Sequence, residues 1–259
     1  MIRLRGVAVL LICLIAFVGC QGQPAFTQGL GSKIWVGRYQ EIEEYLRTAE
    51  CVSMEVFAPA NSTPRLFAFG RCTLRPGGPF GRMAWRALPP GVHRGFSESY
   101  RAEIVAYELD KLLKMDMVPP SVERQIQGNK GGAQLWVENV VDATDPTTPQ
   151  PSEKIHWEAQ LVRMTMFDTL IGSRDRNLRN MLRDRAWNLI LLDHSRSFTT
   201  GTELVQKLNR VDESFWAKIE GLTLDELNRT LGPWIDESQI KAMLERRNRM
   251  RVEIRSLPK

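Results

Sequence analysis

Three polar residues in the second half of the chain have the types and spacing that phosphoryl transfer requires. Asp175 is followed five residues later by Asn180, and Asp193 stands at the end of the apolar run 187–192. A carboxylate such as Asp175 can orient or deprotonate an attacking hydroxyl, while an amide and a second carboxylate can hold Mg²⁺ on a nucleotide's phosphates. Mg²⁺ needs few protein ligands because the phosphates supply the rest. Asp and Asn in loops also cap helices and shape turns, so the spacing alone leaves both interpretations open.

The neighbouring elements predict how these residues come together. Residues 161–171 have the length and apolar spacing of a helix, which would end at Gly172 and deliver Asp175 on a loop. Two short strands within 181–192 read as a hairpin. Folding that hairpin returns the second Asp to the neighbourhood of the Asn, so one cleft would receive all three oxygen ligands.

The order of predicted elements indicates a two-lobed molecule. The first half is β-rich with one main helix, and a segment rich in Pro and Thr separates it from a mostly helical half. The predicted strands are 52–57, 66–74, 83–88 and a hairpin over 122–137; the predicted helices are 38–49, 97–114, 204–208, 213–219, 224–231 and 237–254. This layout predicts an α+β, protein-kinase-like fold with an N-lobe at 38–140, a linker at 141–154 and a C-lobe at 155–259.

The first half offers the parts that a nucleotide-binding lobe needs. Gly77, Gly78 and Gly81 form a glycine-rich turn whose backbone could approach phosphate closely. Arg86 lies on the following strand and Glu103 on the helix after it, an order that predicts an ion pair facing the cleft. Glycines are also common in ordinary hairpin turns, and ion pairs of this kind are common on protein surfaces. The turn, Arg86 and Glu103 therefore indicate a nucleotide-binding lobe only in combination.

Two blocks of sequence resemble the secretory-pathway kinases that include the Golgi casein kinase, in a bacterial branch that shares features with HipA and phosphoinositide kinases. The matching segments are 99–113 and 117–124 in the first half, and 167–172, 175–177, Asn180 and 192–198 in the second. The resemblance implies a catalytic Asp175, metal ligands Asn180 and Asp193, and Glu103 as the helix carboxylate. It also implies ATP and Mg²⁺ or Mn²⁺ as cofactors.

The chain departs from the family pattern at three positions. Arg86 stands where the family has a phosphate-binding Lys, and a planar guanidinium does not replace a compact ammonium conservatively. Asn177 stands where related kinases often have His, and the segment 193–195, Asp-His-Ser, lacks the usual Gly. Arg86 is the departure that puts activity in doubt.

The N-terminus predicts export from a bacterial cell. A basic start precedes an apolar run that is too short to span a bilayer, which indicates a signal peptide over 1–19. Phe17 to Cys20 resembles a lipobox, which predicts lipidation of Cys20 and a membrane-anchored protein; a plain cleaved signal and release into the periplasm is the alternative. Residues 20–37 would form a tether.

The net charge limits the possible partners of the mature chain, and its cysteines could form one disulfide. Loss of Arg3 and Arg5 with the signal leaves 33 basic and 30 acidic residues, a net charge of +3. This mild charge argues against nucleic acid as a partner. The basic segment 245–251 is interpreted as a solvated helix face, with contact to a membrane surface or an acidic partner as the alternative. Cys51 and Cys72 could pair in an oxidising compartment or stay free.

Two functions therefore remain open from the sequence. The first is a phosphotransferase that uses ATP and Mg²⁺ to modify a hydroxyl on a protein, sugar or lipid. The second is a degenerate kinase fold that acts as a binding or regulatory module at the cell envelope. Arg86 and the scarcity of ATP outside the cytoplasm favour the second, and the intact Asp/Asn/Asp set favours the first.

Overall fold

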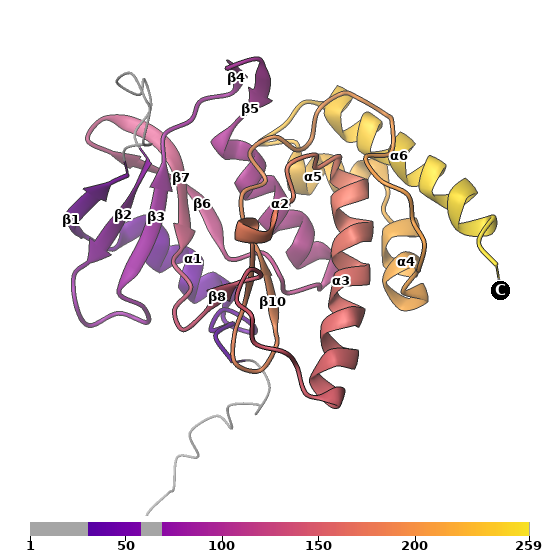
Figure 1. Ribbon diagram of the computed structural model, residues 1–259. Coiled ribbons are helices and arrows are strands. Elements are labelled where there is room, and N and C mark those ends of the chain that lie inside the picture. Colours follow the sequence, from indigo (N-terminus) through magenta and orange to yellow (C-terminus); the bar gives the residue numbers. More distant parts are fainter. Residues whose placement is uncertain (1–30, 58–68, 259) are drawn as a thin grey trace, which may run out of the picture.

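The computed structural model describes residues 31–57 and 69–258, which form two lobes (Figure 1). In chain order the elements are α1 (Tyr39–Thr48), β1 (Cys51–Val56), β2 (Phe69–Leu74), β3 (Arg82–Arg86), β4 (Gly91–His93), β5 (Phe96–Glu98), α2 (Tyr100–Leu113), β6 (Ser121–Ile126), β7 (Asn129–Leu135), β8 (Val141–Asp142), α3 (Pro151–Ile171), the 3₁₀ turn η1 (Leu178–Asn180), β9 (Met181–Arg183), β10 (Leu189–Leu191), α4 (Glu213–Glu220), α5 (Leu224–Leu231) and α6 (Glu237–Arg255). The predicted signal peptide, Cys20, the first part of the predicted tether and the start of the strand predicted at 66–74 lie outside the described residues.

The N-lobe is built on one antiparallel sheet with the strand order β1-β2-β3-β7-β6. Successive side chains on a strand point to opposite faces, so β3 buries Met83 and Trp85 in the lobe's core. Its other residues, Arg82, Ala84 and Arg86, line a cavity on the opposite face. The sheet therefore separates an apolar core under α1 from a polar roof over the space between the lobes.

The segment before α1 is part of the folded N-lobe rather than a tether. Trp35 is fully buried and packs in the same core as Ile42 and Leu46 of α1. The backbone N–H of Ser32 donates to the Asp184 carboxylate at 2.8 Å, which ties this segment to the other lobe. The prediction of a tether is thus wrong for the described residues 31–37, because a buried Trp anchors them.

The cysteine pair forms a disulfide between neighbouring strands. Cys51 of β1 is bonded to Cys72 of β2, 21 residues later in the chain. The alternative of two free thiols, which the sequence left open, is therefore not what the fold adopts.

Helix α2 connects the two lobes. Ser99 caps its N-terminus by accepting a hydrogen bond from the Arg101 N–H at 3.0 Å. Its buried residues Val105 and Leu109 belong to the C-lobe core, where Phe167 of α3 also packs. Figure 1 shows α2 between the sheet and the helices of the C-lobe, so its apolar stripe faces the second lobe.

The C-lobe is mostly helical, as predicted, and its long helix starts earlier than predicted. Helix α3 begins at Pro151, within the predicted linker, because Gln150 and Glu153 form a reciprocal capping box. It ends at Gly172, whose φ of +71° is the left-handed conformation that glycine adopts readily. The loop that follows carries the candidate catalytic residue.

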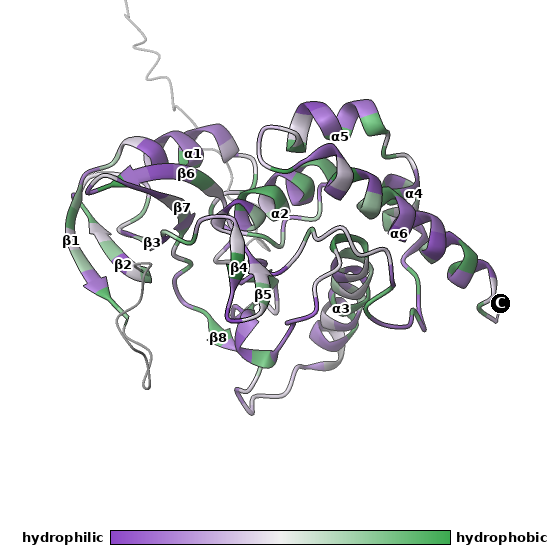
Figure 2. Ribbon diagram, turned by 90° about the horizontal axis from the view of Figure 1, so that it is seen from above, coloured by the Kyte–Doolittle hydropathy of each residue, from purple (hydrophilic) through white to green (hydrophobic). Residues whose placement is uncertain are grey.

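The structure differs from the sequence interpretation at three further places. Residues 204–208 have no helix, and the hairpin β4–β5 was not predicted. Figure 2 shows α6 as largely hydrophilic, yet Arg246 on this helix is fully buried and donates to the carbonyl of Leu170 at 2.8 Å. The basic segment is therefore in part structural. No helix among the described residues is long and apolar enough to cross a membrane.

Candidate active site

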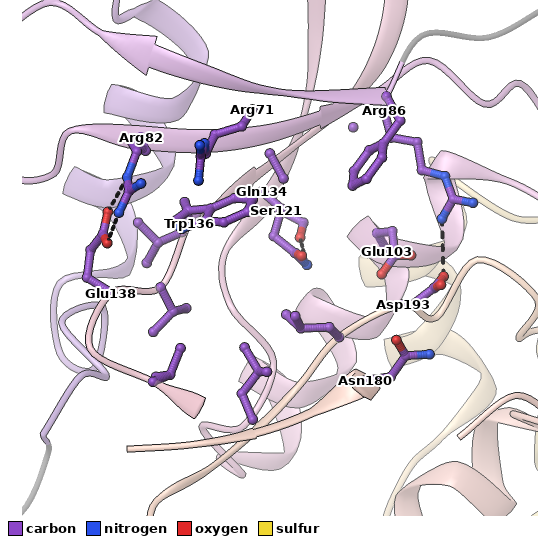
Figure 3. Close-up of a pocket in the computed structure, with 18 of the residues that line it drawn as sticks. Arg71, Arg82, Arg86, Glu103, Ser121, Gln134, Trp136, Glu138, Asn180 and Asp193 are labelled. Carbon is purple, nitrogen blue, oxygen red and sulfur yellow. Dashed lines mark hydrogen bonds and ion pairs between the residues drawn. The ribbon is translucent and has the colours of Figure 1, made fainter. Parts of the chain in front are cut away.

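Asp193 lies where the second lobe meets the roof of the cavity. It follows β10 and has a φ of +53°, a left-handed conformation that is uncommon outside glycine but tolerated by Asp. Its Oδ1 accepts a hydrogen bond from the Ser195 hydroxyl at 2.8 Å. Residues held in sparsely populated backbone conformations cluster at functional sites, and here the conformation aims the carboxylate at the cavity (Figure 3).

Arg86 contacts this carboxylate and not the one predicted for it. Its Nη1 lies 3.1 Å from Oδ1 of Asp193. Burial by itself raises the pKa of Asp193, but the charge of Arg86 and the hydrogen bond from Ser195 outweigh it, so the net pKa is lowered. The candidate metal ligand is therefore an anion at neutral pH. The predicted ion pair of Arg86 with Glu103 is not formed, because Asp193 takes the guanidinium.

Glu103 instead holds the backbone beside the candidate metal ligand. Both of its carboxylate oxygens accept the backbone N–H of His194, at 3.0 and 2.9 Å, and Oε2 lies 3.3 Å from His194 Nδ1. The His194 ring is fully buried edge-on to Phe167, with ring centroids 6.2 Å apart. Helix α2 thus fixes the position of Asp193 through its neighbour in the chain.

Asn180 and Asp175 are brought together on the loop after α3. The Asn180 side-chain amide donates to the backbone carbonyl of Asp175 at 3.3 Å. This hydrogen bond turns the amide nitrogen away from the cavity, and Figure 3 shows the amide oxygen on the side of Glu103 and Asp193. The Leu192 N–H donates to the Asn180 carbonyl at 2.9 Å, which places the amide beside the end of β10. The predicted hairpin therefore does return Asp193 to the neighbourhood of Asn180.

The Asp175 side chain does not line the cavity and is held by an arginine that the sequence did not single out. Arg196 Nη1 lies 3.0 Å from Asp175 Oδ2, and Arg196 Nε donates to Glu98 at 2.7 Å. The guanidinium also stacks over Phe96, with its carbon 4.0 Å from the ring centroid. The hairpin β4–β5 thereby reaches the candidate catalytic base. The hydrogen bond from Arg196 to Glu98 raises the pKa of this guanidinium further, so it remains charged.

Arg176 is the residue that joins the parts of the site. It makes a bidentate ion pair with Asp168 of α3, with both N–O distances 2.9 Å, and only 1% of the Asp168 side chain is exposed. Its Nη1 donates to the carbonyls of Asn180 at 3.0 Å and Leu192 at 2.7 Å. Its Nη2 lies 3.0 Å from His194 Nε2. The sequence does contain a signal for this role. Arg176 lies between Asp175 and Asn180, and it follows Asp168 of the preceding helix by eight residues.

The glycine-rich turn lies at the wrong end of the sheet to cover phosphates. Gly77, Gly78 and Gly81 join β2 to β3, and none of them lines the cavity. The register pairs Phe69 with Arg86, so the turn is at the other end of β3, about 13 Å from Arg86 at 3.3 Å per residue. A Cβ at Gly78 would fall within 1.9 Å of the Tyr45 ring, which shows that this glycine serves close packing against α1. The structure therefore does not bring the three glycines of the phosphate-binding prediction to the cavity.

The cavity between the lobes is about 720 Å³, large enough for a nucleotide or another ligand of that size. Charged residues stand at its two ends, and the space between them is lined by apolar side chains together with Ser121 and Gln134 (Figure 3). One end holds Arg86, Glu103, Asn180 and Asp193; the other holds Arg71, Arg82, Trp136 and Glu138.

Comparison with known proteins identifies the fold. No family model matches the chain, and no curated protein matches it significantly. Among solved structures, the Golgi casein kinase with Mn/ADP bound has a TM-score of 0.60 at 13% identity, covering 83% of this chain and 75% of that one. Hydra Fam20 with sugar has a TM-score of 0.55 at 14% identity, covering 84% and 88%. The Helicobacter pylori proinflammatory kinase CtkA has a TM-score of 0.51 at 11% identity, covering 80% and 94%.

The chain therefore has a two-lobed protein-kinase-like fold, and the resemblance found in its sequence is confirmed at the level of the fold. These identities are too low to carry over an activity, a substrate or a residue's role.

The donor set at the Asp193 end of the cavity fits a hard divalent cation. Asp193 offers a carboxylate and Asn180 an amide oxygen, and oxygen is the ligand type that Mg²⁺ prefers. The described residues hold no group of three or more His, Cys, Asp and Glu side chains suited to a metal on its own. A cation here would thus depend on ligand phosphates for the rest of its coordination.

Proposed function

We propose that the protein is a metal-dependent phosphotransferase, an atypical kinase that transfers a phosphoryl group from a nucleotide to a hydroxyl acceptor. ATP is the donor that the resemblance implies, and a protein, a sugar and a lipid are the acceptor classes. The observation that carries the proposal is the meeting of Asp193 and Asn180 at one end of a 720 Å³ cavity in a kinase-like fold, with the backbone of Asp175 hydrogen-bonded to Asn180.

Each residue has a role that follows from its position. Asn180 and Asp193 would hold Mg²⁺ or Mn²⁺, which would neutralise charge on the phosphates. Asp175 would orient the acceptor hydroxyl and take its proton once its carboxylate is released from Arg196. Arg86 would move from Asp193 to a phosphate once the metal neutralises that carboxylate, because the guanidinium is a good phosphate partner. Glu103 would keep Asp193 in place through His194.

A nucleotide-binding titration with and without Mn²⁺ or Mg²⁺ tests this function. The sharpest variant is Asp193→Asn, since Asn also tolerates the left-handed backbone that Asp193 adopts. We expect metal-dependent binding of ATP that falls at least tenfold in this variant. Asp225→Asn, on the exposed side of α5, is the matched control and should bind as the wild type does. Absence of nucleotide binding by the wild type would refute the proposal.

A catalytically silent, regulatory nucleotide-binding module is the second candidate, and the ion pair of Arg86 with Asp193 favours it. An arginine bound to the metal ligand would compete with the metal. Arg86→Lys separates the two candidates: turnover that rises from a low level supports an enzyme limited by its arginine. Metal-independent binding without phosphoryl transfer in either form supports the silent module.

We also propose that the protein is exported and anchored at the bacterial cell envelope through lipidated Cys20. The support is the sequence of the first 20 residues, and the Cys51–Cys72 disulfide fits an oxidising compartment. Mass spectrometry of the mature N-terminus tests it: an acylated Cys20 is expected. An unmodified N-terminus at this point would leave export by a plain signal.

A further inference from the structure

The end of the cavity away from Asp193 carries a second bidentate ion pair. Arg82 Nε donates to Glu138 Oε1 at 2.7 Å, and Arg82 Nη2 contacts Oε2 of the same carboxylate. Both side chains line the cavity, and Figure 3 shows the pair opposite the one between Arg86 and Asp193. Because β3 is extended, the Cα atoms of Arg82 and Arg86 are about 13 Å apart. A nucleotide with its phosphates at Arg86 would therefore have its base near Arg82 and Glu138.

The middle of the cavity suits a flat ring. Ala84 of β3 lines it from the N-lobe, while Leu182 and Leu192 line it from the C-lobe hairpin. A purine held between these apolar side chains has its polar atoms only at its edge. The groups at the end of the cavity then decide which base fits.

The Arg82 guanidinium is held in place by its surroundings. Its central carbon lies 5.8 Å from the Trp136 ring centroid, and that of Arg71 lies 5.0 Å from the same ring. Arg71 is itself paired with Glu55 at 2.5 Å. These contacts limit the freedom that Arg82 and Glu138 would lose on binding a ligand, because long side chains are costly to order.

Guanine matches a carboxylate and a guanidinium better than adenine does. Guanine presents two adjacent N–H donors, N1 and N2, to a carboxylate, and the adjacent acceptors O6 and N7 to a guanidinium. Adenine has one exocyclic donor between two acceptors, so each charged group makes one hydrogen bond at most. The group that pairs with adenine at two points is an amide. Gln134 already donates to the Ser121 hydroxyl at 2.9 Å, so Asn139, next to Glu138 in the chain, is the lining amide that could read adenine instead.

We propose that the base end of this pocket selects guanine over adenine. The ion pair between Arg82 and Glu138 opens on binding and is exchanged for contacts to the base, with Glu138 accepting from N1–H and N2–H and Arg82 donating to O6 and N7. The inference rests on the proposed function. It differs from that proposal only in the base of the nucleotide, which is guanine in place of adenine. A bidentate contact to a base discriminates by about fivefold to about 150-fold in affinity. The Arg82 and Glu138 side chains are 35% and 43% exposed, so water weakens the effect and we expect a preference of about tenfold, near the lower end of that range.

The test compares the affinities of GDP, IDP and ADP for the purified protein by calorimetry, each with Mn²⁺. IDP lacks the N2 amine and so removes one of the two contacts to Glu138 from the side of the ligand. The expected order is GDP tighter than IDP, and IDP tighter than ADP. In Glu138→Gln the advantage of GDP over IDP should disappear, because a side-chain amide cannot accept from both donors. Glu55→Gln is the matched control, since it removes the partner of another roof arginine without changing the cavity lining; it should keep the wild-type order.

The outcomes separate this inference from the function beneath it. Metal-dependent ADP binding as tight as GDP binding, or tighter, overturns the guanine preference and leaves the phosphotransferase proposal standing. Loss of the preference in Glu55→Gln to the same degree as in Glu138→Gln also overturns it, since the effect would then not be local. Binding of none of the three nucleotides overturns both proposals. The wild-type comparison needs no variant, so it remains decisive even where a substitution prevents folding.

Discussion

Replacing Arg176 by methionine is expected to be strongly destabilising. Methionine preserves much of the side chain's apolar length and removes the charge. The Asp168 carboxylate, 1% exposed, then loses both of its hydrogen bonds to Arg176. Leaving one partner of a buried ion pair uncompensated costs about 3 to 5 kcal/mol. The carbonyls of Asn180 and Leu192 also lose a donor, and the His194 ring loses its contact with the guanidinium.

Urea unfolding followed by far-UV circular dichroism measures this loss at neutral pH. The double variant Asp168→Leu/Arg176→Met removes both charges, and replacing a buried pair by apolar residues is often close to neutral. We therefore expect the double variant to be more stable than Arg176→Met alone. Arg210→Met, which breaks an exposed ion pair with Glu158, is the matched control, with an expected change of at most about 1 kcal/mol. A loss below about 1 kcal/mol in Arg176→Met, or a double variant no more stable than the single one, would show that this arginine does not hold the site together.

Three further predictions concern the parts of the fold around the site. Trp35→Ala should cost about 3 to 5 kcal/mol in urea unfolding, as for other buried aromatic residues; a negligible loss would return residues 31–37 to the role of a tether. Reduction of the Cys51–Cys72 disulfide should lower stability by about 3 kcal/mol, because it releases a loop closed over 21 residues; unfolding curves that coincide with and without reductant would contradict this. Hydrogen bonds from Ser214, Arg163 and the Phe215 N–H overcome the effect of burial and lower the pKa of Asp212 to about 2, so its contribution is present above pH 4 and lost as the pH falls through 2. Asp212→Ala should therefore cost about 2 kcal/mol at pH 7 and progressively less from pH 4 to 2; a constant difference over that range would refute the assignment.

The sequence predicts the C-lobe part of the site well because its signals are local. The apolar spacing of α3, the glycine that ends it and the short hairpin after it all depend on neighbours within about 20 residues. These elements suffice to bring Asp193 next to Asn180. The two-lobed fold follows from the order of elements, which the structural comparisons confirm.

The contacts that the sequence did not predict are long-range. Arg86 and Asp193 are 107 residues apart, and the choice between Asp193 and Glu103 as the arginine's partner depends on where α2 docks. A glycine motif does not reveal which end of a sheet it occupies. The sequence therefore could not show that the turn at 77–81 lies away from the cavity. A basic stretch predicts a solvated surface, and only the fold shows that Arg246 within it is buried and donates to the carbonyl of Leu170.

The docking of α2 has a consequence for motion between the lobes. Its apolar face is part of the C-lobe core, and Glu103 grips the His194 backbone with two hydrogen bonds. A helix held in this way cannot swing outward as an on–off switch without opening that core. The parts of the cavity formed by α2 and the C-lobe are thus held in place before a ligand binds. Adjustment to a ligand would then come from movement of the N-lobe sheet. A regulatory partner would accordingly act on the sheet and its loops. Ligand binding would change the orientation of the N-lobe sheet relative to the C-lobe.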